Sequence, residues 1–369
     1  MRHASLLVLA ILVSSFLLLA GCSLNPTPPP APPPPAPTAP APPSAVPNAT
    51  PNTTANASAN ATNASDNSSF VSTIVAHNET EPNASANQSN RTVLAPANDR
   101  LEMLFVNVGE ADATLLREGN LTILIDTGSA DSSAALIGAL RSVGVSRLDL
   151  LVLTTFESDK IGGLPDVLRG FHTVSAWHDG SVPDSPEYVN DIGLLQSSVQ
   201  SVVLPQAGQS YAYGPLNISI FNPQPTRYPS NPRADSIAMR LAFGKFCAFL
   251  PGDTTDEEDP YIVSAMNSTP CPVYKWRYHG EGRPTPSVLY DRLQPRDVVI
   301  SVGPNSDGLP SPTTLQRLNI SNATVWRTDQ NGSIYLLANL SGDYAITAPA
   351  DLPAIGAWYA AAYPAPSPG

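Results

Sequence analysis

Two short segments hold side chains that could do chemistry together. Glu157, Asp159 and Lys160 lie in LVLTTFESDKIGGL, and His279 lies in YKWRYHGEG. Carboxylate oxygens and imidazole nitrogens are ligands for divalent cations, and the same groups serve in general acid–base catalysis. A lysine beside them carries a positive charge that opposes a bound cation. The pattern leaves open whether this is a metal site, an acid–base site or neither.

The elements that must position these groups are mostly apolar strands. The runs LEMLFVNVG and LTILIDTG predict strands ending in glycine-containing turns, which carry Asp112 and Asp126. The run LDLLVLTT predicts a strand buried on both faces, and the acidic segment with Lys160 follows it. Asp253 ends the strand-like run FCAFLPGD. Each of these carboxylates therefore follows a predicted strand.

The order of elements predicts an α/β domain. Strands alternate with helices in both halves of the body, with shorter strands from Val202 to Pro251 between them. This alternation predicts two β layers with helices outside, an αββα sandwich. The segment DEEDPYIVSAM predicts a helix that is broken by Pro260.

Six segments resemble, in the same order, segments of the metallo-β-lactamase fold superfamily, and most of all the extracytoplasmic hydrolase domain of ComEC-type competence proteins. FVNVGEADATLLREGNLTILIDTGS is similar to a DVGQGDA turn followed by LIDTG, and LVLTTFESDKIGGL is similar to LVLTHPHADHIGGL. The other four segments are DSIAMRLAFGKFCAFLPGD, YKWRYHGEGRPT, VVISVGPNSDGLPSPTTLQRL and WRTDQNGSIYL. The resemblance runs from Met103 to about Ile346. It implies a metallo-β-lactamase-type sandwich, and for the family a metal-dependent hydrolase activity, such as a phosphodiesterase.

The metal-binding pattern of that family is degenerate here. In the run similar to HxHxDH, Thr155 stands at the first histidine, Glu157 at the second and Lys160 at the last, so only Asp159 keeps its type. In the segment similar to PHHGS, the second histidine remains as His279. The other altered histidine positions are Tyr278, Leu309 and Ser311.

The resemblance therefore implies a cleft with few ligands. The set left for a metal is Glu157, Asp159, Asp253 and His279, which would suit Zn²⁺ or Mn²⁺, or the harder Mg²⁺ and Ca²⁺. By the same resemblance, Asp112 and Asp126 are candidate cleft residues, as are Glu157 and Asp253.

We favour a site without a cofactor, in which the Lys160 ammonium sits among Glu157, Asp159 and Asp253 in place of a cation. The domain would then be a non-catalytic binding or surface module. One alternative is a working metal-dependent hydrolase with an atypical site. The other is a metal-free acid–base enzyme using Asp159, Lys160 and His279.

The first 98 residues predict an anchor and a stalk. Residues 1–22 read as a lipoprotein signal, with a lipobox before Cys22, which would carry a membrane-anchoring lipid at the cell surface. An uncleaved transmembrane anchor is the alternative. Residues 23–98 are a Pro-rich and then sequon-rich linker that cannot form a core. Its candidate glycosylation sites are Asn48, Asn52, Asn56, Asn60, Asn63, Asn67, Asn78 and Asn83.

The rest of the chain is the folded body, expected at residues 99–348, and a tail at 349–369. The formal net charge of −12 argues against general nucleic-acid binding, because such binding uses Lys and Arg to neutralise phosphates. A protein or a small polar ligand is the expected partner. Cys247 and Cys271 could form a disulfide in an exported protein or remain two buried thiols.

Overall fold

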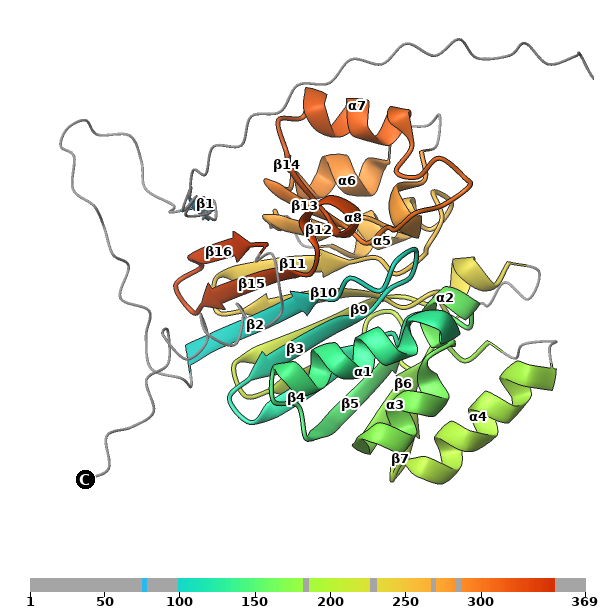
Figure 1. Cartoon of the computed structure of the whole chain (residues 1–369). Helices are drawn as coiled ribbons and strands as arrows, with labels where there is room; N and C mark the ends of the chain where they lie inside the picture. Colours follow the sequence, from blue (N-terminus) through green and yellow to red (C-terminus); the bar gives the residue numbers. More distant parts are fainter. Residues whose placement is uncertain are drawn as a thin grey trace, which may run out of the picture. The chain divides into compact units, whose positions relative to one another are not determined.

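The computed structural model describes residues 75–77, 99–181, 186–225, 231–266, 270–282 and 287–348. Within them lie two β-sheets packed face to face, each covered by helices on its outer side (Figure 1). This is the predicted αββα sandwich. The predicted signal segment, most of the linker and the tail lie outside the described residues. A short strand, β1 (Val75–His77), lies in the stretch predicted as linker and pairs with β16.

The first sheet has nine strands in the order β1-β16-β15-β2-β3-β4-β5-β6-β7. Helices α1 (Ser133–Ser142), α3 (Leu164–Gly170) and α4 (Pro186–Ser198) follow its strands. Strands β4, β5, β6 and β7 are parallel, so the chain must return to the same end of the sheet between one strand and the next. The connecting segments are mostly helical. The remaining strands are β2 (Arg100–Phe105), β3 (Thr114–Glu118), β4 (Leu121–Ile125), β5 (Arg147–Leu153), β6 (His172–His178), β7 (Ser201–Val203), β15 (Ile334–Asn339) and β16 (Tyr344–Thr347).

The second sheet has seven strands in the order β14-β13-β12-β11-β10-β9-β8. Its strands from β11 to β14 are parallel, and α5 (Asp259–Ala265), α6 (Val288–Leu293) and α7 (Pro312–Ile320) connect them. The strands are β8 (Ser210–Tyr213), β9 (Leu216–Asn222), β10 (Ala238–Phe243), β11 (Phe246–Leu250), β12 (Val273–Lys275), β13 (Asp297–Ile300) and β14 (Thr324–Arg327). Short helical turns are α2 (Ser158–Ile161) and α8 (Thr328–Asn331), with 3-10 turns at Ala130–Ser132, Pro232–Asp235 and Tyr278–Gly280.

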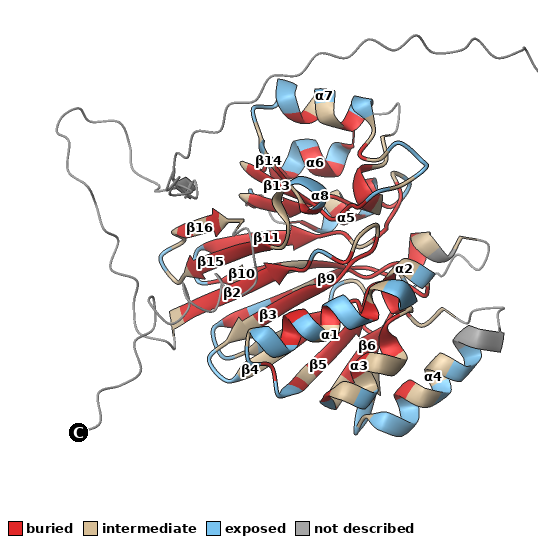
Figure 2. Ribbon diagram, viewed as in Figure 1, coloured by how far each residue is buried: buried red, intermediate tan, exposed pale blue. Residues whose placement is uncertain are grey.

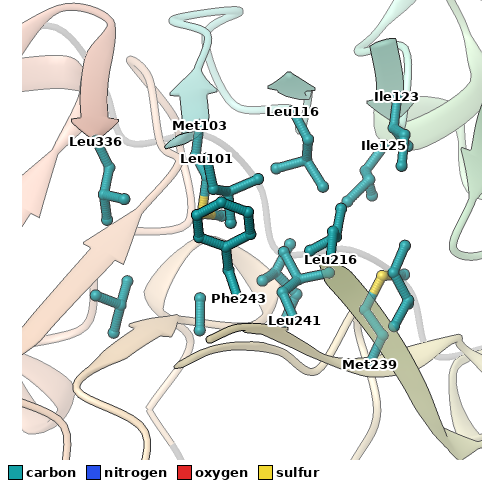
Figure 3. Packing of buried hydrophobic residues seen from close by; sticks show 14 of the residues in the cluster. Leu101, Met103, Leu116, Ile123, Ile125, Leu216, Met239, Leu241, Phe243 and Leu336 are labelled. Carbon is teal, nitrogen blue, oxygen red and sulfur yellow. The ribbon is translucent and has the colours of Figure 1, made fainter. Parts of the chain in front are cut away.

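The main core lies between the two sheets. Met103 and Leu116 of the first sheet face Leu241 and Phe243 of the second, and all four side chains are almost fully buried (Figure 3). Figure 2 shows the strands buried and the outer helices exposed on one side. The strand β5 is buried on both faces because α1 and α3 cover its far side, as its unbroken apolar run predicts.

Two local features of the second half were open or mispredicted from sequence. Cys247 and Cys271 form a disulfide between β11 and the start of β12, with their Cα atoms 4.9 Å apart. Pro260 does not break a helix: it lies in the first turn of α5, which begins at Asp259. Proline is accommodated there because the first N–H groups of a helix have no partner within it.

Candidate functional site

The candidate residues meet at one edge of the sandwich, where strands of both sheets end. Asp126 follows β4, and the segment from Thr154 to Lys160 follows β5. From the second sheet, Asp253 follows β11 and His279 follows β12. The carboxyl ends of parallel strands lie at the same edge of a sheet, and this is where open α/β sheets place their ligands. The fold therefore brings together residues that are far apart in the chain.

Two adjacent glycines let the loop after β5 pack against its neighbours. A Cβ atom on Gly162 would lie 2.4 Å from the backbone nitrogen of Ala130, and one on Gly163 would lie 2.2 Å from the carbonyl oxygen of Thr127. Real Cβ atoms do not come so close, so only glycine fits at these two places. The Gly-Gly pair of the sequence is thus needed for the close approach of this loop to the turn after β4.

Backbone hydrogen bonds fix the same loop in place. The Asp112 N–H donates to the carbonyl of Asp159 at 3.0 Å, and the Thr127 N–H donates to the carbonyl of Lys160 at 2.6 Å. The Thr127 hydroxyl also donates to the Lys160 carbonyl, at 2.9 Å. The backbones of Asp159 and Lys160 are therefore anchored independently of their side chains, which leaves the side chains in a defined position.

Lys160 is the centre of the site. Its side chain is fully buried, and its ammonium group contacts the carboxylates of Asp112, Asp159 and Asp253. The Nζ atom lies 2.9 Å from Oδ2 of Asp159 and 2.9 Å from Oδ2 of Asp253. Burial alone would lower the pKa of the lysine, but the surrounding carboxylates raise it well above its usual value. Lys160 is therefore a permanently charged cation at physiological pH.

A second lysine shares one of these carboxylates. Asp112 is 2 % exposed, and its two oxygens contact different ammonium groups, Oδ2 that of Lys160 and Oδ1 that of Lys275. Burial would raise the pKa of Asp112, but the two lysines hold it well below its usual range. Sequence reasoning missed Lys275. A lysine within the apolar strand β12 could have indicated a buried ion pair, because an unpaired lysine is almost never buried.

His279 closes the cluster. Its Nε2 atom lies 3.0 Å from Oδ2 of Asp159, and its Nδ1 atom lies 2.9 Å from the carbonyl oxygen of Ser301. A carbonyl and a carboxylate both accept, so both ring nitrogens donate and the ring is an imidazolium. Burial and the nearby Lys160 lower the pKa of His279, but its bond to Asp159 and the neighbouring carboxylates outweigh them and raise it. The His279 backbone has φ 48°, a conformation uncommon outside glycine.

The charges of the cluster cancel. Three carboxylates, those of Asp112, Asp159 and Asp253, face two ammonium groups and one imidazolium. For Asp159, burial would raise the pKa, but Lys160 and the hydrogen bond from His279 lower it. Each of these charges therefore faces at least one charge of the opposite sign.

Two predicted cleft residues lie beside the cluster rather than in it. Glu157 does not contact Lys160, contrary to the prediction: its Oε1 atom accepts from Nε of Arg233 at 2.8 Å. The guanidinium of Arg233 also lies 3.8 Å from the ring centroid of Tyr278, where the family has a histidine. Arg233 had no sequence signal, because it precedes β10 in an ordinary polar turn. Glu157 lost its predicted role because the loop turns its side chain towards that arginine.

Asp126 has a separate role. Both of its carboxyl oxygens contact the Thr154 hydroxyl, and Oδ1 also accepts from the Thr154 N–H at 2.8 Å. Burial raises the pKa of Asp126 to about 8, so it is mostly a neutral acid at pH 7. The carboxyl group thereby joins the ends of β4 and β5.

The residues present do not fit a divalent metal as they are arranged. Asp112, Asp159 and His279 each offer one ligand atom, and these atoms lie within 4.8 Å of one another. However, the Lys160 ammonium already contacts the same two carboxylates. A dication about 4 Å from an ammonium would be repelled by roughly 8 kcal/mol at an effective dielectric near 20. Thr155, at the first histidine position, is fully buried and supplies no strong ligand.

The acid–base alternative is also disfavoured by the geometry. Lys160 is held protonated by three carboxylates, so it has no lone pair with which to act as a nucleophile or base. Both nitrogens of His279 donate to fixed acceptors. Neither the lysine nor the histidine of the cluster therefore has a free lone pair with which to act as the base.

Comparison with known proteins identifies the fold. The family model of the metallo-β-lactamase superfamily matches residues 106–229, which include the turn with Asp112, the turn with Asp126 and the Lys160 loop. The chain has the metallo-β-lactamase fold. This confirms the predicted fold.

Two curated relatives of this metallo-β-lactamase-fold chain are competence proteins. ComE operon protein 3 of Bacillus subtilis is 23 % identical over 270 residues, which cover 68 % of this chain and 35 % of that protein. Competence protein ComA of Neisseria gonorrhoeae is 22 % identical over 231 residues, covering 62 % of this chain and 31 % of that protein. The chain spans about a third of the length of these relatives. They support the resemblance to ComEC-type proteins at low identity.

Similar solved structures include the metallo-β-lactamase fold protein YhfI from Bacillus subtilis, at 14 % identity and a TM-score of 0.44, covering 63 % of this chain and 97 % of that one. CmlA, a diiron β-hydroxylase from Streptomyces venezuelae, has 14 % identity and a TM-score of 0.41 and covers 67 % of this chain and 55 % of that one.

In the described part of the chain, none of the helices is both long and apolar enough to cross a membrane.

Proposed function

We propose that this chain is a non-catalytic metallo-β-lactamase-fold module, in which the Lys160 ammonium takes the place of the family's metal. The observation that carries the proposal is the contact of one fully buried ammonium with three carboxylates, those of Asp112, Asp159 and Asp253. A divalent cation normally holds such a group of acids together, because their mutual repulsion is otherwise unopposed. Here the protein supplies the positive charge itself.

The energetic argument favours permanent replacement over competition between lysine and metal. For a metal to enter, Lys160 would have to lose its proton or move away. Its raised pKa opposes the loss of the proton, and its complete burial leaves its ammonium no path to solvent without a change of the loop. The loop itself is anchored by the backbone hydrogen bonds at Asp159 and Lys160.

A metal-dependent hydrolase is the second candidate, as the superfamily implies. The favouring observation is that ligand atoms of Asp112, Asp159 and His279 lie within 4.8 Å of one another. In that case these three residues would hold the ion, and the ion would supply Lewis acidity to a phosphoryl or carbonyl oxygen. No role would remain for a charged Lys160 in its present position.

Assays with bis-p-nitrophenyl phosphate separate the two candidates. We expect no turnover by the purified protein with Mn²⁺, with Zn²⁺ or with a chelator. The matched variants are Asp159→Asn, within the cluster, and Asp291→Asn, whose side chain is 59 % exposed and lies outside it. Turnover that EDTA abolishes, that Asp159→Asn removes and that Asp291→Asn retains would establish the hydrolase instead.

The anchor and stalk complete the proposal. The lipobox before Cys22 and the Pro-rich and sequon-rich segment after it support a lipid-anchored, glycosylated stalk that presents the domain outside the membrane. Metabolic labelling with a fatty acid would mark the wild-type chain and spare Cys22→Ser. Label in both, or in neither, would contradict lipid attachment at this cysteine.

A further inference from the structure

A cavity of about 300 Å³ lies on the outer side of the second sheet and adjoins the ion cluster at Asp253. Its walls come from the turn after β11, the end of β12, the start of α6 and the length of α7. Figure 1 shows α6 and α7 above the sheet. Tyr274 and Trp276, which line it, belong to the core cluster beneath the outer helices and not to the core between the sheets. This volume is at the lower end of the range for small-molecule sites.

One wall of the cavity is aromatic. Tyr274, Trp276 and Tyr278 alternate along the chain as β12 ends, and all three line the cavity. Residues two apart in an extended chain point to the same side, so Tyr274 and Trp276 form one surface. Tyr278 follows them in the 3-10 turn Tyr278–Gly280. The rings of Tyr274 and Trp276 meet edge to face, with centroids 5.8 Å apart. Their mutual packing holds this wall rigid.

That wall carries a tyrosine hydroxyl with no hydrogen-bond partner among the described residues. The Tyr274 side chain is only 1 % exposed, and within the described part of the chain its hydroxyl makes no hydrogen bond. Because this side chain lines the cavity, the missing acceptor or donor would be supplied by whatever fills it.

The ionised groups of the wall cancel one another. Arg277 forms ion pairs with Asp256 at 2.6 Å and Asp259 at 2.8 Å, and Arg317 pairs with Asp291 at 3.0 Å. The carboxylates would repel a bound phosphate, and the guanidinium groups would repel a bound ammonium ion. The wall therefore favours neither anions nor cations. The arginines and carboxylates lining the cavity are Arg233, Arg277, Arg317, Asp253, Asp256 and Glu281.

We propose that this cavity binds a neutral polyhydroxylated ring, a monosaccharide or disaccharide unit. A sugar hydroxyl both donates and accepts, so it matches a wall that mixes carboxylate acceptors with tyrosine, threonine and guanidinium donors. A carboxylate has about four acceptor sites, so its existing ion pairs do not exhaust it. The C–H face of the ring packs on Trp276, and a ring oxygen or hydroxyl meets the Tyr274 hydroxyl.

This inference goes beyond the proposed function, and its test is designed so that the two can fail separately. Asp253 and Tyr278 border both regions, but Tyr274, Trp276 and Thr313 belong to the cavity alone. All binding measurements are therefore made in EDTA. A failure to bind sugar then leaves the question of metal unaffected, and a catalytic metal would leave sugar binding unaffected.

The test uses the full chain and a defined set of ligands. Glucose, galactose, mannose, N-acetylglucosamine, maltose, lactose and chitobiose are titrated separately, with tryptophan fluorescence and saturation-transfer NMR as readouts. Inorganic phosphate and choline serve as charged comparators. We expect saturable binding of at least one sugar and a weaker response to both charged ligands.

Three variants locate the binding. Tyr274→Phe removes only the hydroxyl and should weaken sugar binding about five- to tenfold, the value of one hydrogen bond. Thr313→Ala, at an exposed position on the rim, should weaken it about two- to fivefold without affecting folding. Tyr211→Phe, a half-buried tyrosine on β8 outside the cavity, is the control and should bind as the wild type does.

Several results would overturn the proposal. These are saturable binding of none of the seven sugars, stronger binding of phosphate or choline than of any sugar, and equal affinities in all three variants. If Tyr274→Phe fails to fold, as circular dichroism would show, Thr313→Ala decides: an unchanged affinity in that variant contradicts binding in this cavity.

Discussion

Replacing Lys160 by methionine tests the ion cluster most sharply. Methionine has a similar length and no charge, so the change removes the ammonium with little change of volume. Three carboxylates lose their shared partner, two of which, Asp112 and Asp253, are 2 % exposed. Asp112 keeps its contact with Lys275, and Asp159 keeps its bond from His279. The Asp253 oxygen that faced the ammonium is left without its countercharge.

The size of the effect follows from the burial. Removing one partner from a buried ion pair costs about 3–5 kcal/mol, because the other charge stays buried and uncompensated. For a domain of this size, each kcal/mol lowers the melting temperature by about 2–4 °C, so we expect a fall of roughly 6–20 °C. Lys245→Met is the matched control, because Lys245 is an exposed lysine in the turn between β10 and β11. It should change the free energy of unfolding by less than about 0.5 kcal/mol.

The pH dependence adds a second signature. The pKa values of Asp112 and Asp159 are lowered in the folded state, so they contribute stability above the unfolded value of about 3.9. That contribution is lost as the pH falls through the folded values. The gap in unfolding free energy between wild type and Lys160→Met should therefore be largest near pH 7 and shrink below about pH 4.

Urea denaturation at a series of pH values measures both effects. Equal midpoints for the wild type and Lys160→Met at pH 7, or a gap that widens on acidification, would refute the reasoning. A loss of unfolding free energy in Lys160→Met equal to that in Lys245→Met would also refute the reasoning. It would show that the buried ammonium contributes no more to stability than an exposed one.

Three further predictions concern neighbouring groups. Asp126→Asn should be more stable than the wild type at pH 8 but not at pH 4, and the difference at pH 8 should be at least the ~1.4 kcal/mol of one pKa unit. The reason is that the wild type loses stability as the pH rises from the pKa of an unfolded Asp towards about 8, the pKa of Asp126 in the folded protein. Urea denaturation at both pH values checks this, and equal differences in unfolding free energy at pH 4 and pH 8 would contradict it. Lys275→Met should lower the unfolding free energy by about 1–3 kcal/mol, less than Lys160→Met does, because the lost partner is one carboxylate; a larger loss would place the centre of the cluster at Lys275. Replacing both Cys247 and Cys271 by alanine should cost about 3 kcal/mol for a loop of 24 residues; a melting temperature that dithiothreitol lowers equally in wild type and double variant would argue against the disulfide.

The fold was largely predictable because its core elements are strongly periodic. Unbroken apolar runs at β5 and alternating runs in the second half predict buried and half-buried strands without tertiary information. Pro260 was misread because a proline is compatible with the first turn of a helix and disruptive further in, and the sequence does not show where the helix begins.

The candidate site was only partly predictable. The presence of a lysine beside carboxylates indicated charge replacement, but the partners depend on which loops meet. Asp112, on the turn between β2 and β3, takes the place predicted for Glu157, because that loop hydrogen-bonds directly to the Asp159 backbone. Glu157 instead pairs with Arg233, 76 residues away in the chain. Side-chain direction at a loop end follows from packing between distant segments, which one sequence does not reveal.

Metal content is the most direct test of the central claim. The protein is purified with Zn²⁺ and Mn²⁺ supplied during expression, dialysed without chelator and analysed by inductively coupled plasma mass spectrometry. The account predicts far less than one metal ion per chain in the wild type, because Lys160 holds the carboxylates of the cluster. One bound zinc or manganese ion per chain that Asp159→Asn removes would contradict it.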